Sequence, residues 1–239
     1  MSATRVRAIF GKELREYRRN RAIVLTMGIV PAVFLIQPLV QIFHLPAASA
    51  GTLAHKHPLL YMLGIPALVP ALIGAATVVG ERQQGTLEPV LTTPIRREEL
   101  ILGKALAVLV PSLVVAYAVF GLAVASIAAF AATPVASAVL RGSDLLAQVV
   151  FTPMLATWSI WISMGISSRA GDFRVAQQLA TLASLPTIIV VALISFDVIA
   201  VTLGLAIGLG AALLILDRLG WRVVSALFDR ERLITGTRA

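Results

Sequence analysis

Six stretches of the chain contain only uncharged, mostly apolar residues, and each is long enough to cross a lipid bilayer as a helix. A helix rises about 1.5 Å per residue, so a hydrocarbon core of about 30 Å takes roughly 20 residues. We therefore predict an all-α integral membrane protein in which residues 22–216 form a six-helix transmembrane domain. The predicted spans are residues 22–43, 59–80, 105–131, 147–168, 176–196 and 198–216.

The positively charged residues are concentrated in alternate connections between the predicted spans. With the N-terminus placed in the cytoplasm, 18 of the 20 Lys and Arg residues lie on the cytoplasmic side and 2 lie outside. Because Lys and Arg near membrane spans are retained in the cytoplasm, this distribution predicts that both termini are cytoplasmic. The net charge of +8 then lies at that face, where membrane lipid rather than nucleic acid is the expected partner.

The composition agrees with a membrane protein and narrows its possible activities. Only 13% of the 239 residues are charged, against roughly a quarter in a soluble domain, which argues against a soluble fold. No Asp, Glu, Lys or Arg lies inside a predicted span. A self-contained secondary carrier driven by protons or sodium would therefore lack a coupling residue.

Metal chemistry and ATP hydrolysis are not expected of this chain. It has no Cys, and its three His residues, His44, His55 and His57, lie in one connection that we expect to be a solvated loop. The phosphate-binding pattern G-x-x-x-x-G-K-[ST] is absent from the sequence. We predict no catalytic residue, no metal site and no ATP site on the chain.

Residues 1–21 are predicted to form a cytoplasmic amphipathic helix that lies in the membrane interface. Apolar side chains recur at helical spacing while basic residues occupy the other positions, a pattern typical of interfacial helices. The alternative is a solvated run of charge. A second helix is predicted in the cytoplasmic tail, residues 217–239. The apolar positions of the first helix are Val6, Ile9, Phe10, Leu14 and Tyr17.

The connection between the second and third spans contains helix start and stop signals. Gly85 is expected to end one helix, Thr86 can cap a short helix through its hydroxyl, and Pro94 stops it. We predict a short helix at residues 85–95 that lies across the inner face of the membrane. An exposed apolar patch on such a helix indicates a contact surface, and packing against the protein's own helix ends or lipid is the alternative. The apolar side is formed by Leu87, Val90 and Leu91.

Neutral polar and aromatic side chains inside the spans leave two interpretations open. Gln37 and Gln41 lie one turn apart on the same helix face, where they either line a pathway or form hydrogen bonds between helices. Trp158 and Trp161 either stack on a hydrophobic substrate or face lipid.

The sequence GERQQGTLEPVLTTPIRREELILGK, residues 80–104, resembles the cytoplasmic signature of the membrane subunits of ABC-2-type transporters, the ATP-binding-cassette export permeases. The shared features are a Glu, then Gly-Thr-Leu-Glu, a Thr-Pro step, a charged cluster and a Gly-Lys pair. The likeness extends more weakly to FGKELREYRRNR before the first span and SSRAGDFRVAQQL before the fifth. One position departs, because Arg96 stands where members often have Ser or Thr as the helix N-cap.

This resemblance implies partners and residue roles. Two permease subunits, identical or sister, pair around the translocation path, and two copies of an ATP-binding-cassette ATPase subunit dock beneath them. This chain holds no cofactor, since ATP and Mg bind the partner ATPase. Span one and span five line the dimer interface, which implicates Gln37, Gln41 and Ser184 in the substrate path. The residues implied to couple to the ATPase, in or beside the coupling helix at 85–95, are Glu81, Gly85, Thr86, Leu87, Glu88, Leu91, Pro94, Arg97 and Lys104.

The function that the resemblance predicts is a permease subunit, which exports a drug, ion or small amphiphile across a bacterial inner (plasma) membrane. The link between spans five and six has little beyond Asp197, which leaves little room for the re-entrant external helices of some polysaccharide and lipid exporters. A lipid or glycan exporter of the same family is therefore the first alternative. The second is a non-transporting membrane scaffold or immunity protein that recruits a cytosolic partner.

Overall fold

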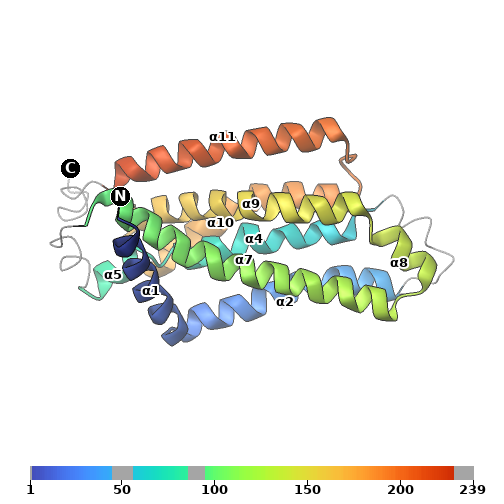
Figure 1. The fold of residues 1–239 in the computed structure, drawn as a ribbon, viewed down its shortest axis with the longest axis horizontal. Helices are drawn as coiled ribbons and strands as arrows, with labels where there is room; N and C mark the ends of the chain where they lie inside the picture. The colour runs from blue at the N-terminus through green and yellow to red at the C-terminus, as the bar shows by residue number, and fades with distance from the viewer. Residues whose placement is uncertain (1, 45–55, 86–94, 229–239) are drawn as a thin grey trace.

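The computed structural model describes residues 2–44, 56–85 and 95–228, and the secondary structure in these ranges is helical. Six helical segments are long and apolar enough to cross a membrane, which confirms the predicted number of spans. They run side by side along the long axis of the molecule (Figure 1). These segments are Arg21–His44, Pro58–Gln83, Arg97–Phe130, Gly142–Arg169, Phe173–Ser195 and Leu203–Leu227.

The six segments contain helices α2 (Arg21–His44), α4 (Gly64–Gly74), α7 (Arg97–Phe130), α9 (Gly142–Arg169), α10 (Phe173–Ser195) and α11 (Leu203–Leu227). The second segment also contains the 3-10 helix η2 (Pro58–Leu63) and α5 (Val79–Gln83). Helices α1 (Ala3–Arg19) and α8 (Thr133–Val139) lie outside the six segments.

Helix α4 lies at the centre of the bundle. In the most apolar stretch of its segment 83% of the residues are buried. In the corresponding stretches of the other five segments, between 0% and 39% are buried. It contacts α2, α7, α9 and α10. The outer helices consequently leave broad apolar faces uncovered, which suits a surface that meets lipid or another subunit.

The second membrane segment is interrupted, although the hydropathy pattern predicts one continuous span at 59–80. A turn at residues 75–78 separates α4 from α5. The Ser167 hydroxyl of α9 accepts hydrogen bonds from the backbone N–H groups of Val78 and Val79, both at 3.1 Å, and donates to the carbonyl of Ala75 at 2.8 Å. Because a bilayer offers no water to free backbone groups, this hydroxyl makes the interruption tolerable.

Two helices extend beyond the predicted limits of their spans. Helix α7 begins at Arg97 rather than at residue 105, and α11 continues through residue 216 to Leu227. Arg96, the N-cap residue of α7, has no hydroxyl that could cap the helix, so the start of α7 is stabilised in another way. The Arg96 backbone N–H instead donates to the Glu99 carboxylate at 3.1 Å, which is one half of a capping box.

The end of the bundle opposite α1 is held together by a histidine and an aspartate. His57 Nδ1 lies 2.9 Å from Asp144 at the start of α9, and the His57 backbone N–H donates to the Ser195 carbonyl of α10 at 3.3 Å. Asp144 is buried. The expectation of a solvated loop is therefore wrong for His57, which joins three helices.

Candidate functional site

Helix α1 packs against the first turns of α7 with a face that contains a carboxylate. Ile9, Glu13 and Tyr17, which are spaced four apart, are the buried residues of this helix. The approach of the two helices is close, because a Cβ atom built on Gly103 of α7 would lie 2.7 Å from Ile9 Cγ2. Only glycine at position 103 leaves room for this packing. The amphipathic pattern of α1 thus serves contact with the protein itself.

A buried network of two lysines and two glutamates joins three distant segments of the chain. Lys104 of α7 is fully buried, and its Nζ donates to Glu13 of α1 at 2.7 Å and lies 2.9 Å from Glu81 of α5. Lys12 of α1 donates to the other Glu81 oxygen at 2.5 Å. Lys104 also donates to the Thr77 carbonyl at 2.9 Å. We call Lys12, Glu13, Glu81 and Lys104 the lysine–glutamate network.

The charges of this network balance, and each residue has an oppositely charged partner. A buried charge is tolerated in proteins when it is paired and hydrogen-bonded. Burial alone would lower the pKa of Lys12, but its hydrogen bond to Glu81 and the nearby Glu13 carboxylate raise that pKa above its usual value. Lys12 therefore keeps its positive charge at any physiological pH.

A second ionic contact ties the start of α1 to the start of α7. The Glu99 carboxylate, which is buried, accepts a hydrogen bond from the Ser2 backbone N–H at 2.6 Å. It also pairs with Arg5 at 3.4 Å. Glu99 thus caps α7 and anchors the beginning of α1 at the same time.

Helix α5 is bonded on its other side to α9 and α10. The Arg82 guanidinium donates to the carbonyls of Ser168 at 2.9 Å and Ala170 at 3.0 Å, at the end of α9. The Gln83 amide donates to Asp172 at 2.8 Å. This hydrogen bond, together with backbone N–H groups at the start of α10, holds the pKa of Asp172 below its usual value. Helix α5 is therefore bonded to α1 and α7 on one side and to the end of α9 and the start of α10 on the other.

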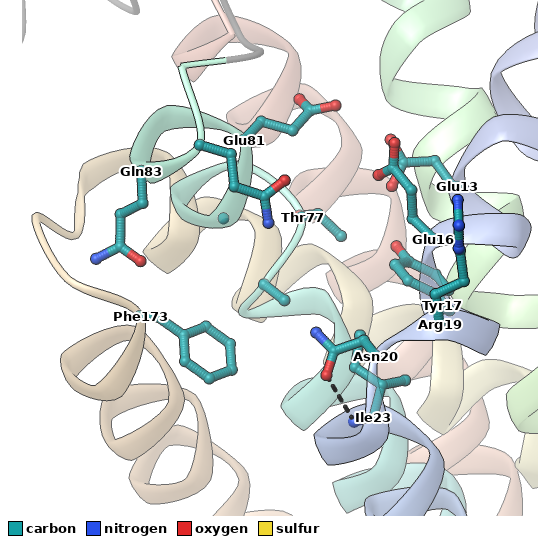
Figure 2. A pocket seen from close by; sticks show the side chains of 13 residues that line it. Glu13, Glu16, Tyr17, Arg19, Asn20, Ile23, Thr77, Glu81, Gln83 and Phe173 are labelled. Carbon is teal, nitrogen blue, oxygen red and sulfur yellow. Dashed lines mark hydrogen bonds between the residues drawn. The ribbon is translucent and has the colours of Figure 1, made fainter.

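A cavity of about 500 Å³ opens beside the network, between α1, α5 and the start of α10. Figure 2 shows the side chains of Glu13, Glu16 and Tyr17 on one side of it and Phe173 on another. Carboxylate oxygens of Glu13, Glu16 and Glu81 lie within 4.8 Å of one another. Lys12 pairs with all three carboxylates and Lys104 pairs with Glu13 and Glu81, so the two lysines balance two of the three negative charges. Burial raises the pKa of Tyr17, which keeps its phenol protonated.

Comparison with known proteins identifies the family. The family model described as "ABC-2 family transporter protein" matches residues 7–221, which include the whole lysine–glutamate network. The chain belongs to the ABC-2 transporter family. No curated protein matches it significantly.

The family assignment confirms the resemblance seen in the sequence. This ABC-2 protein is a multi-span membrane permease, and such permeases are typically the non-catalytic membrane component of a transporter that works with an ATPase partner.

The structure brings together some of the residues implied to couple the permease to its ATPase. Glu81 and Lys104 meet in the network, and Arg97 is exposed as the first residue of α7. Gly85 follows α5 with a φ of +67°, a left-handed conformation that favours glycine, which confirms that a helix ends there. Residues 86–94, which make up most of the short helix predicted at 85–95, lie outside the described residues. The other implied coupling residues all fall there, namely Thr86, Leu87, Glu88, Leu91 and Pro94.

The residues implied for the substrate path of the permease lie on α2 and α10. Gln37 is half-buried, and its Oε1 has no hydrogen-bond partner among the described residues. Gln41 lies one turn further along α2 and is also half-buried. Ser184 is buried, and its hydroxyl donates to the Ala180 carbonyl of its own helix at 2.8 Å. Their part in a substrate path stays a prediction.

Several residues of the site were not identified from the sequence. Glu13 is the clearest case, because it shares the helical face of Ile9 and Tyr17, where an acid interrupts an apolar stripe. An acid in the middle of an apolar face is a sequence signal from which the burial of Glu13 could have been predicted. Its partner Lys104 lies 91 residues away, so the pairing itself had no sequence signal. The remaining residues that were not identified are Lys12, Thr77, Arg82, Glu99 and Asp172.

Proposed function

We propose that this permease exports a drug, ion or small amphiphile across a bacterial inner membrane, using ATP hydrolysed by a separate subunit. Two permease subunits, identical or sister, would enclose the path, and two ATP-binding-cassette ATPases would bind at the α1 end of the bundle. ATP and Mg bind the ATPase and not this chain. The α1 end, which carries most of the Lys and Arg residues, faces the cytoplasm and its anionic lipid.

The observation that carries this proposal is that members of the lysine–glutamate network lie on both sides of residues 85–95. Glu81 lies four residues before Gly85, and Lys104 lies nine residues after Ile95, two turns into α7. Both flanks of this connection are therefore fixed to α1, and Arg82 fixes the first flank to α9 as well.

This arrangement supports transmission of movement from the ATPase to the spans. ATP binding draws the two ATPases together, and residues 85–95 move with them as the coupling helix. Since α5 is bonded to α1, α7 and α9, a displacement of this segment moves the α1 end of the bundle as a rigid body. Thr86, Leu87, Glu88, Leu91, Pro94 and Arg97 contact the ATPase in this proposal, while Glu81, Gly85 and Lys104 position the segment.

The proposal is tested by measuring permease-dependent, vanadate-sensitive ATP hydrolysis in vesicles that hold the permease and its ATPase. Glu88→Ala and Arg97→Ala should lower this activity several-fold while the permease remains inserted at its normal level. Lys56→Ala is the matched control, because Lys56 is an exposed cation at the opposite end. Normal hydrolysis and normal assembly in both coupling variants would overturn the assignment of residues 85–95.

A further inference from the structure

The last helix, α11, lies along α9 at the outside of the bundle (Figure 1). Two contacts show that the two helices run in the same direction with a constant offset of residue numbers. A Cβ atom on Gly210 would lie 4.0 Å from Phe151, and one on Gly220 would lie 2.7 Å from Trp161. The two positions are ten residues apart on each helix, so residue 217 of α11 lies at the level of residue 158 of α9.

A carboxylate occupies the contact stripe that α11 turns toward α9. The stripe follows three- and four-residue spacing through Gly210, Leu213, Asp217, Gly220 and Val224. Asp217 is half-buried, and its Oδ1 is shielded from solvent without a hydrogen-bond partner among the described residues. No ion pair to Asp217 is formed within the described ranges, and its neighbour Arg218 is exposed.

Among the described residues, packing does not account for this carboxylate, which is costly to the fold. An unpaired charge in a membrane-embedded helix contact loses hydration without gaining a partner. Every other residue of the stripe is apolar or glycine, so an apolar side chain at 217 would suit the contact better. An ionisable residue at such a place marks a candidate functional site, and a negative charge there attracts a ligand of opposite charge.

An apolar groove runs along α11 as far as Leu216, the residue before Asp217, although Asp217 itself is not one of its lining residues. It has a volume of about 440 Å³, lies between α9, α10 and α11, and is lined by apolar side chains except for Thr187 and the indole of Trp158. This is within the size range of sites for drug-sized ligands. Leu213 and Leu216 of α11 line the groove within one turn of Asp217, and Trp158 lines it at the same level.

We propose that this groove binds a monovalent hydrophobic cation. The apolar body of the ligand lies among the leucines, and its cationic group lies at Asp217 beside the Trp158 ring, which also attracts cations. An anion of the same shape is repelled, because a charge acts strongly in a low-dielectric site. The inference rests on the proposed export function, for which it names the substrate class.

The test uses two probes of matched shape and opposite charge, tetraphenylphosphonium and tetraphenylborate. Their binding to the full-length permease alone, in zwitterionic lipid nanodiscs, is measured by equilibrium dialysis. The wild type should bind the cation saturably and the anion far more weakly. Asp217→Asn should weaken cation binding about tenfold or more, the loss expected for one charge contact. Asp197→Asn, which removes an exposed carboxylate at the opposite end, should leave it unchanged.

A second variant tests the groove without touching the charge. Ala206→Phe fills the groove from α11 and should also reduce cation binding, while thermal unfolding confirms that each variant is folded. The inference is overturned if Asp217→Asn binds the cation as the wild type does. It is equally overturned if the cation and anion bind alike, as they would in a groove that holds only lipid chains.

Failure of the binding site can be distinguished from failure of the proposed export function. Binding is measured without an ATPase, whereas export requires one. Binding of the cation by a permease that never associates with an ATPase would overturn the export proposal and support the site. ATP-driven export by a permease that does not bind the cation would overturn the site alone.

Discussion

Lys104 Nζ lies 2.7 Å from a carboxylate oxygen of Glu13, and both side chains are almost completely buried although 91 residues separate them in the chain. This pair fixes α1 to α7. It also places the amine against Glu81, so that the segment leading into residues 85–95 is held by the same charge. Because Lys104 pairs with both glutamates, its loss should affect the stability of the fold and the position of the segment that precedes residues 85–95.

Removing Lys104 should destabilise the permease strongly. Lys104→Met leaves Glu13 and Glu81 short of a buried partner, at a cost of about 3–5 kcal/mol. The double variant Glu13→Gln with Lys104→Met should lose at least about 1 kcal/mol less than the sum of the two single variants, because partners in one network are not independent. Unfolding of the purified protein in mild detergent measures all three. Additive losses would contradict a direct pairing.

Enlarging Gly103 should loosen α1. A Cβ atom there meets Ile9 at 2.7 Å and the Val6 carbonyl at 3.3 Å, so Gly103→Ala should cost about 1–3 kcal/mol through overpacking. Hydrogen exchange of residues 3–19 should become faster. Gly121→Ala on the same helix is the control, because a Cβ atom at Gly121 meets nothing within 4 Å. Equal protection of α1 in the two variants would argue against the close packing.

The hydroxyl of Ser167 should matter more than that of Ser184. Ser167→Ala leaves two backbone N–H groups and one carbonyl at the α4–α5 turn without their partner, which should cost about 1–3 kcal/mol. Ser184 bonds only a carbonyl of its own helix, so Ser184→Ala should change stability much less. The two thermal unfolding midpoints provide the measurement, and equal midpoints would refute the role given to Ser167.

Asp172 should make a pH-dependent contribution to stability. Its pKa in the folded protein is lowered below the usual value near 3.8, chiefly by the Gln83 hydrogen bond. A carboxyl of this kind stabilises the fold fully above its unfolded-state pKa, and the stabilisation disappears as the pH falls through the folded-state pKa. The stability difference between wild type and Asp172→Ala should be constant from about pH 8 to 5 and should shrink below pH 4. A difference that stays constant down to pH 3 would contradict this account.

The sequence was sufficient to predict the six membrane segments, because a bilayer requires about 20 consecutive apolar residues and charge bounds each stretch. It was not sufficient to predict the turn at residues 75–78. That turn depends on the Ser167 hydroxyl, which comes from α9 and is distant in sequence. Hydropathy also placed the end of the sixth span at 216, since it measures transfer to lipid and not the length of a helix.

The site was predicted in part. Glu81 and Lys104 were implicated by the family resemblance, and the structure adds the reason that they lie together. Their partner Glu13 was missed, because an acid on a basic helix is ordinarily solvated, as the neighbouring Glu16 is. Asp217 was assigned to a tail rather than to a span, so nothing in the hydropathy pattern pointed to its position at the level of Trp158.

The most direct test of the central claim is purification of the tagged permease from its native membranes in mild detergent. Mass spectrometry then identifies its partners, and an ATPase assay is run on the purified material. The account predicts a stoichiometric ATP-binding-cassette subunit and ATP hydrolysis that vanadate inhibits. A folded, monodisperse permease that carries no ATPase, even after cross-linking in the membrane, would contradict it.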